Sequence, residues 1–190
     1  MVHSQQDTKK NTMRLLSALF IFPIFLAVMV MIVWCIYVDN KPSVSEYISS
    51  ILDVSIEDAD VARRLETHGG FLGDGMSFYI IKYNDDSIID EIRNNNHWIQ
   101  LQINDDNLNI LMYGESIKQE YKETGPIFCD SDGKGLFPEI KNGYYFFKDR
   151  NSESSDMWDS SGIIDRSSFN FTVAVYDEDN RILYFGELDT

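Results

Sequence analysis

Near its C-terminus the chain reads SFNFTVAVY (Ser168–Tyr176), DEDN (Asp177–Asn180) and RILYFGEL (Arg181–Leu188). The two outer segments are rich in aromatic and β-branched residues, which favour strands. The four residues between them are polar and typical of turns. The pattern therefore predicts an antiparallel β-hairpin.

Other patterns precede this hairpin. Strands are predicted at Ile51–Ile56, Met76–Tyr83, Trp98–Ile103 and Tyr144–Lys148. Isoleucines at helical spacing predict a helix over Asp85–Asn94, residues 58–66 fit one or two helical turns, and residues 105–113 are ambiguous. Residues 115–143 contain several Gly, Pro, Asp and Asn turn pairs and are expected to be irregular.

The order of these elements predicts the fold class. Helical patterns come early and strand patterns come late, which is typical of an α+β domain. We expect a single domain with a mostly antiparallel sheet, helices on one face and a C-terminal hairpin or meander.

A long apolar run lies at the other end of the chain. Leu15–Val38 contains 24 residues and no charged side chain. A helix of this length reaches ~36 Å, enough to cross a ~30 Å hydrocarbon core. A cleavable signal peptide would be shorter and would end at a small-residue cleavage site. The run therefore predicts one retained transmembrane helix.

The flanking charges predict its orientation. Lys9, Lys10 and Arg14 precede the run, whereas Asp39 and Lys41 follow it and nearly cancel. The positive-inside rule then places the N-terminus in the cytoplasm. The expected organisation is a cytoplasmic tail (1–14), a membrane span (15–38), a juxtamembrane linker (39–50) and an extracytoplasmic α+β domain (51–190). The expected location is thus the cell membrane.

The part after the apolar run is strongly acidic. Of 16 Lys and Arg residues only three precede Val38, and of 31 Asp and Glu residues only Asp7 does, so the remainder has a formal charge of −17. Such a field repels nucleic acid and attracts basic proteins or peptides. Acidity also keeps an exported domain soluble, which explains the charge without any partner.

Cysteine usage bears on the compartment. Cys35 lies in the apolar run and Cys129 is the one cysteine after it, so no disulfide is expected between them. An exported domain without disulfides fits a bacterial surface better than a eukaryotic secretory protein.

A glycine-rich segment is the best candidate for ligand contact. Three glycines lie between His68 and Asp74, and a fourth directly follows Asp74. Glycines let backbone amides converge on an anion. A simple turn between two strands explains the same residues. The ligand-binding candidates are His68, Gly69, Gly70, Gly73 and Asp74, together with Tyr145 from the aromatic strand.

One acidic stretch is a candidate calcium site. Asp130 and Asp132 alternate before Gly133, as in the first half of a calcium loop. However, Lys134 stands where an oxygen ligand is needed, and an Asp-Gly turn explains the sequence equally well. We therefore predict no metal, no cofactor and no catalytic set.

Three functions remain open. The first is a non-enzymatic, membrane-anchored binding or accessory module for a cationic protein or a cell-wall ligand. The second is an exported hydrolase using His68 with Asp74. The third is an inhibitor or immunity protein for a basic partner.

Overall fold

The computed structural model describes residues 22–35, 42–57, 59–69, 73–116, 123–124 and 126–190. The chain divides into two compact units, residues 1–43 and 44–190. In the first unit residues 22–35 form a helix, and its large apolar side chains are between 43% (Met29) and 68% (Phe22) exposed.

The predicted membrane span lies only partly within the described residues. Residues 15–21 and 36–38 of that span lie outside them. Within the described part of the chain, no helix has both the length and the apolar character needed to cross a bilayer.

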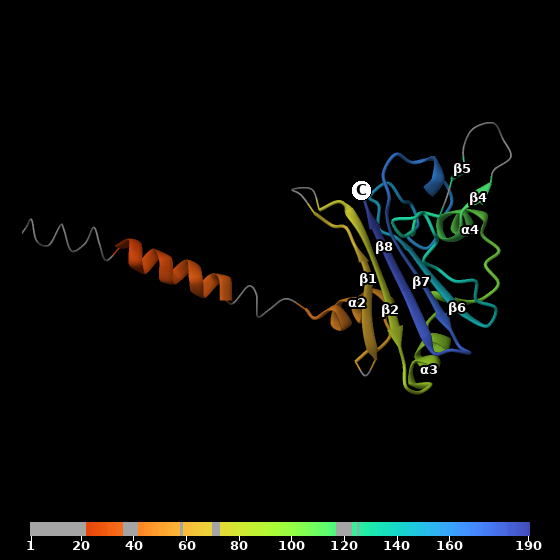
Figure 1. Cartoon of the computed structure of the whole chain (residues 1–190), viewed down its shortest axis with the longest axis horizontal. Coiled ribbons are helices and arrows are strands. Elements are labelled where there is room, and N and C mark those ends of the chain that lie inside the picture. Colours follow the sequence, from red (N-terminus) through yellow and green to blue (C-terminus); the bar gives the residue numbers. More distant parts are fainter. Residues whose placement is uncertain (1–21, 36–41, 58, 70–72, 117–122, 125) are drawn as a thin grey trace, which may run out of the picture. The chain divides into compact units, whose positions relative to one another are not determined.

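The second unit contains a six-stranded antiparallel sheet in the described part of the chain (Figure 1). Its strands are β1 (Asp60–Glu66), β2 (Gly75–Lys82), β3 (Trp98–Gln100), β6 (Gly143–Asp149), β7 (Asn170–Asp177) and β8 (Ile182–Asp189). Their order is β1-β2-β8-β7-β6-β3, and every neighbouring pair is antiparallel. Two short strands, β4 (Glu115–Ser116) and β5 (Glu123–Thr124), pair separately.

The predicted hairpin is confirmed as β7 and β8, which form the centre of the sheet. The α+β class and the antiparallel sheet are confirmed as well. Seven of the eight residues of β7 are buried, so this strand is covered on both faces.

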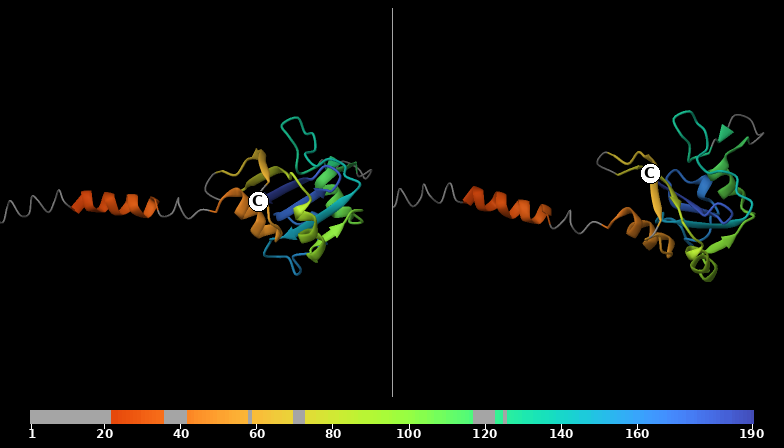
Figure 2. Two further views of the ribbon diagram at one scale, coloured as in Figure 1. Left: turned by 90° about the horizontal axis from the view of Figure 1, so that it is seen from below. Right: turned by 60° about the horizontal axis from the view of Figure 1, so that its bottom comes forward.

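The prediction that the helices cover one face is wrong. Side chains of α2 (Val44–Leu52) and α3 (Ser87–Asn94) pack with Ala174 and Tyr176 of β7 in one core. Side chains of α4 (Asp106–Tyr113) pack with the alternate residues Val173 and Val175 in a second core. The helices therefore lie on both sides of the sheet (Figure 2), because its central strands are apolar on both faces.

Two local predictions are also wrong. The strand expected at Ile51–Ile56 does not form, since α2 continues to Leu52 and buries Ile48 and Leu52 completely at a helical spacing of four residues. The helical turns expected at residues 58–66 are replaced by β1, which pairs with β2. The second compact unit begins at Val44, so α2 lies inside the folded domain.

Other predictions agree with the structure. The strands at Met76–Tyr83 and Tyr144–Lys148 are β2 and β6, and the helix at Asp85–Asn94 is α3. The strand at Trp98–Ile103 is confirmed only for its first half, as β3. The ambiguous residues 105–113 form α4, because the Asp105 side chain accepts hydrogen bonds from the backbone N–H groups of Asn107 and Leu108.

Long connections complete the second core. Phe128 lies in the segment that the sequence indicates to be irregular, yet its side chain is fully buried. Its ring lies 6.2 Å from Phe78, 5.3 Å from Phe137 and 5.8 Å from Phe171 between centroids. Gly186 of β8 supplies the space, since a Cβ there would lie 2.6 Å from Cε1 of Phe128.

We expect Gly186→Ala to lower the free energy of unfolding by about 1–3 kcal/mol, because the enclosed ring of Phe128 cannot move away without strain. Denaturant unfolding of the full chain in detergent micelles measures the change. Gly69→Ala is the control, because among the described residues a Cβ at that exposed glycine comes within 4 Å only of Thr67 O, at 3.9 Å. Equal stability of the Gly186→Ala and Gly69→Ala variants would contradict the close packing.

Candidate functional site

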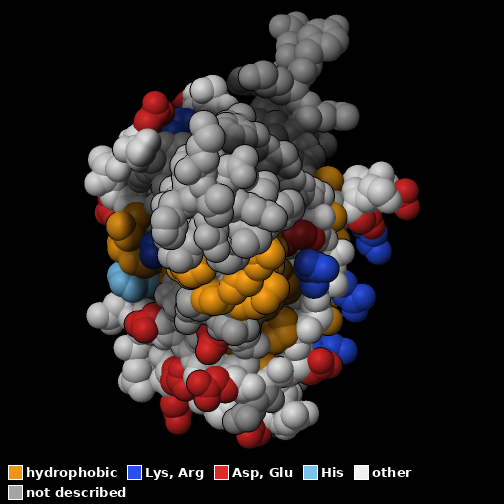
Figure 3. All heavy atoms as spheres, turned by 90° about the vertical axis from the view of Figure 1, so that its left-hand side faces the viewer, with side chains coloured by type: hydrophobic (Ala, Val, Ile, Leu, Met, Phe, Trp, Pro, Cys, Tyr) orange, Lys and Arg blue, Asp and Glu red, His pale blue; other side chains and the backbone are white. Residues whose placement is uncertain are grey.

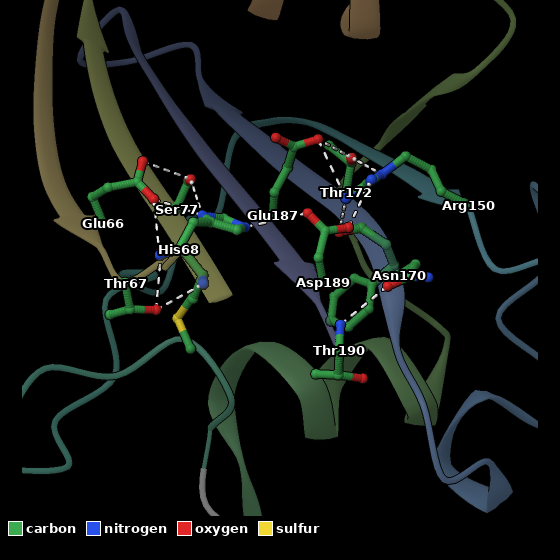
Figure 4. A network of polar contacts seen from close by, with 12 residues as sticks. Glu66, Thr67, His68, Ser77, Arg150, Asn170, Thr172, Glu187, Asp189 and Thr190 are labelled. Carbon is green, nitrogen blue, oxygen red and sulfur yellow. Dashed lines mark hydrogen bonds and ion pairs between the residues drawn. The ribbon is translucent and has the colours of Figure 1, made fainter. Parts of the chain in front are cut away.

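Polar side chains form a row across the sheet on the face that α2 and α3 cover. Glu66 of β1 lies opposite Ser77 of β2, Ser77 lies opposite Glu187 of β8, and Glu187 lies opposite Thr172 of β7. Directly opposed residues share a face of the sheet. Glu187 follows Phe185 by two residues and therefore continues the face on which Phe185 is a core residue. Figure 4 shows the row from close by.

Glu187 is the buried centre of this row, with only 3% of its surface exposed. The Tyr47 hydroxyl donates to its carboxylate at 2.9 and 3.1 Å, and Thr172 Oγ1 donates at 3.0 Å. Arg150 Nη2 lies 3.4 Å from Glu187 Oε1. Burial raises the pKa of Glu187, although these three partners favour its charged form. Glu187, which belongs to β8, therefore connects this strand to α2, to the neighbouring strand β7 and to Arg150 directly after β6.

A second carboxylate, Asp189, is shared by Arg150 and His68. Arg150 Nη1 lies 2.9 Å from Asp189 Oδ1, and His68 Nε2 lies 3.2 Å from Asp189 Oδ2. Arg150 is positioned by its backbone N–H, which donates to the carbonyl of Asn170 at 2.6 Å. Asn170 in turn lies opposite Asp189 in the sheet, so strand pairing brings the guanidinium to the carboxylate.

His68 is held between two carboxylates. Its Nδ1 lies 2.6 Å from Glu66 Oε1, and Nε2 faces Asp189. Burial opposes protonation, but the hydrogen bonds to Glu66 and Asp189 outweigh it and raise the pKa of His68. Conversely, the pKa of Glu66 is lowered, because the bonds from His68 outweigh its partial burial. Gly75 leaves room for this segment, since a Cβ at Gly75 would lie 2.4 Å from the His68 backbone.

We call these residues the polar cluster. Its members are Tyr47, Glu66, His68, Ser77, Arg150, Thr172, Glu187 and Asp189.

The serine, histidine and acid of the polar cluster lie in contact, since Ser77 Oγ is 3.1 Å from His68 Nδ1 and Asp189 Oδ2 is 3.2 Å from His68 Nε2, but two features set them apart from a hydrolase triad. A triad needs a neutral imidazole nitrogen that accepts the serine proton. Both nitrogens of His68 face carboxylates, which favours the imidazolium form, and the Ser77 hydroxyl donates to Glu66 Oε2 at 3.1 Å. Ser77 is also only 6% exposed. The geometry thus favours an internally paired ionic network over a nucleophilic site.

The structure separates the predicted ligand-binding residues. His68 joins the polar cluster, whereas Gly69, Gly73 and Asp74 are exposed. Gly69 N–H donates to the backbone carbonyl of Asp74 at 3.4 Å. Gly70 lies outside the described residues. In the described part of the chain His68 contacts Glu66, Ser77 and Asp189, so its predicted pairing with Asp74 is not formed.

Tyr145 lies far from this arrangement in the fold. Its side chain belongs to the second core, on the opposite face of the sheet, and is 8% exposed. Burial raises the pKa of Tyr145, and the charge of Asp105 raises it further.

The calcium candidates belong to a turn. Asp130 Oδ1 accepts hydrogen bonds from the backbone N–H groups of Asp132 at 3.0 Å and Lys134 at 2.9 Å. The carboxylate of Asp130 therefore stabilises the turn itself. Among the described residues, no group of three or more His, Cys, Asp or Glu side chains is arranged to hold a metal ion.

Comparisons of the chain with protein-family models, with curated proteins and with solved structures find no match. Sequence reasoning found His68 but missed the rest of the polar cluster. One signal was present, because Glu187 occupies the same alternating phase as Leu183 and Phe185 in β8, whose other charged residue is Asp189.

We expect the stability of the chain to fall as the pH rises from 5.5 to 8. The raised pKa of His68 contributes stability that is fully present below pH ~6.5 and is lost as the pH rises through the folded-state pKa. The raised pKa of Glu187 has the same sign, and its contribution to stability is fully present below pH ~4.3 and is lost as the pH rises through the folded-state pKa of that carboxyl. A loss of about 1 kcal/mol corresponds to about 2–4 °C in Tm.

Thermal unfolding of the full chain in micelles measures this slope. His68→Gln should flatten it, because glutamine does not titrate. His97→Gln is the control, since His97 stacks on Trp158 at 3.5 Å and lies outside the polar cluster. A slope that survives His68→Gln unchanged would refute the assignment.

Proposed function

We propose that this protein is a single-pass membrane protein whose acidic domain acts outside the cell membrane as a non-enzymatic binding or accessory module. The apolar run Leu15–Val38 supports the anchor, and Lys9, Lys10 and Arg14 before it support a cytoplasmic N-terminus. In this proposal the domain of residues 44–190 faces the outside.

One observation favours binding over hydrolysis. His68 has a carboxylate at each ring nitrogen, so it offers no free base to activate a nucleophile or a water molecule. The hydrolase hypothesis requires His68 to work with Asp74, and the contacts of His68 give that pairing no support.

The charge of the domain favours a basic partner. The part after Val38 has a formal charge of −17. On the face drawn in Figure 3, acidic side chains gather over the lower part and basic side chains over the right-hand rim. A cationic protein, peptide or cell-wall component is attracted to such a surface, whereas nucleic acid is repelled. An inhibitor of a basic protein is a special case of the same proposal.

Reporter fusions to the full chain test the topology. Alkaline phosphatase fused after Thr190 should be active in a bacterial host, because that enzyme folds only outside the cytoplasm, and a fluorescent protein fused there should stay dark. Changing Lys9, Lys10 and Arg14 to glutamine should reduce the phosphatase signal. The proposal would be overturned if the fluorescent-protein fusion were fluorescent and the alkaline phosphatase fusion were inactive.

Activity assays test the non-enzymatic part. If the purified full chain hydrolyses any ester, peptide or glycoside substrate, we expect the rate to be unchanged in His68→Gln. Turnover that His68→Gln removes and His97→Gln preserves would support the hydrolase instead.

A further inference from the structure

The two edges of the sheet differ in how they are protected. At one edge β1 carries Asp60, Arg63, Arg64 and Glu66, and its register shifts between Arg63 and Leu65. Charged side chains and irregular pairing prevent an edge strand from joining another strand. This edge is therefore closed to strand addition.

The other edge lacks that protection. Its chain segment is Trp98-Ile99-Gln100-Leu101-Gln102-Ile103, which contains no charge, no Gly and no Pro. Short uncharged segments of this kind are prone to pair with further strands. The side chain of Ile99 is 51% exposed. β3 follows β6 at the end of the strand order, so its outer side faces no further strand of the described sheet.

The backbone geometry directs hydrogen-bonding groups outward at this edge. Leu101 N–H donates to the carbonyl of Gly143 at 3.0 Å, and Ile99 lies opposite Tyr145. In an antiparallel pair, alternate residues point their N–H and C=O groups to opposite sides. The backbone groups of Gln100 therefore point away from β6, where an added strand could pair with them.

Two hollows lie beside this segment. The first, of about 420 Å³, is lined by Leu101, Ile103 and Ile140 and by the acidic side chain of Glu139. The second, of about 440 Å³, is lined by Ile99 and Tyr145 and by the acidic side chain of Asp105. Lys141 lines both hollows. The lining of the second hollow is mostly polar, and its Asp105 carboxylate is already bonded to the start of α4 and to Ser160. The first hollow combines apolar walls with the exposed carboxylate of Glu139.

This combination fits long basic side chains. Lys and Arg pack their aliphatic stems on apolar surface and keep the charged end near polar groups. A second copy of this chain is disfavoured as the occupant, because each domain has a formal charge of −17 and the two would repel. A basic segment is instead attracted by the negative charge of the domain.

We propose that the edge formed by β3 and residues 101–103 binds an extended segment of a partner protein, with Lys or Arg at alternate positions, as an added antiparallel or parallel strand. The inference rests on the proposed binding function and names the surface and the partner chemistry. The backbone of Gln100 supplies hydrogen bonds, and the exposed carboxylate of Glu139 receives a basic side chain.

Fluorescence anisotropy with a defined peptide tests the inference. The probe is labelled Lys-Val-Lys-Val-Lys-Val-Lys, added to the full chain in nanodiscs of zwitterionic lipid. We expect it to bind, and we expect Glu139→Lys to weaken binding at least fivefold. Glu57→Lys is the matched control, since it makes the same charge change at an exposed residue that precedes β1 at the other edge, and it should change affinity less than twofold.

Two modified peptides separate strand pairing from simple charge attraction. In a strand that adds to an edge, alternate N–H groups face the sheet. One test peptide is N-methylated on its valines and the other on its lysines. Compared with the unmodified peptide, one of the two should bind at least tenfold more weakly, and the other should stay within about threefold. The inference is overturned if the two bind equally, if the unmodified peptide does not bind, or if a Glu-Val peptide binds as well.

A second copy as occupant is a further decisive outcome. If the full chain forms dimers in detergent that Gln100→Pro dissociates, the edge pairs with itself and the inference is overturned. These measurements use purified protein, so their failure leaves the reporter-fusion result intact. A failed topology test would in turn leave the peptide measurements standing.

Discussion

Arg150→Met is expected to lower the free energy of unfolding by about 2–4 kcal/mol. Arg150 lies 3.4 Å from Glu187 and 2.9 Å from Asp189, and the Glu187 side chain is only 4% exposed. Removing one partner of a buried ion pair leaves the other charge without compensation, which costs far more than losing an exposed pair. Denaturant unfolding of the full chain in micelles measures the change.

The matched control for this variant is Arg93→Met. Arg93 pairs with Glu178 at 2.8 Å, but its side chain is 48% exposed, so we expect a far smaller change. The loss in Arg150→Met should also shrink as the pH falls from 7 towards 5. Without Arg150 the pKa of Glu187 rises further, and a protonated Glu187 no longer carries an unpaired charge. Equal losses in the two variants, or a loss independent of pH, would refute the role given to Arg150.

Phe128→Ala is expected to cost about 3–5 kcal/mol, the usual range for deleting a fully buried aromatic ring. Phe128 is fully buried and lies against Phe78, Phe137 and Phe171. The ring holds the connection before β6 on the second face of the sheet, so its loss opens a cavity and frees that connection. Denaturant unfolding again measures the change, and Phe128→Leu should cost clearly less.

A double-mutant cycle makes this prediction specific. Gly186→Ala is harmful because its Cβ would lie 2.6 Å from the Phe128 ring. In the Phe128→Ala background that clash is absent, so the added methyl group should be neutral or stabilising. Additive losses in the double variant would show that Gly186 and Phe128 do not share this contact.

The polar cluster also affects how the domain is held together near its N-terminal end. α2 packs through Ile48 and Leu52, and Tyr47 of the same helix donates to Glu187. Residues 47 and 187 are 140 positions apart. α2, which follows the predicted anchor in the sequence, is therefore joined to β8 by apolar packing and by a partly buried hydrogen bond.

Sequence reasoning succeeded where structure depends on neighbouring residues. The β7–β8 hairpin, β2 and α3 follow from side-chain periodicity and turn chemistry, which are local properties. The net charge and the apolar run are likewise properties of the chain itself. Sequence reasoning failed at residues 58–66, whose helical pattern was overridden by pairing with β2.

The sequence by itself determined the antiparallel hairpin at the centre of the sheet, the acidity of the domain and the apolar run that precedes it. Only the tertiary structure decided that helices cover both faces, that Phe128 is a core residue and that Glu66, His68, Arg150, Glu187 and Asp189 meet. Burial and ion pairing depend on contacts between residues far apart in the chain. No local pattern can specify such contacts.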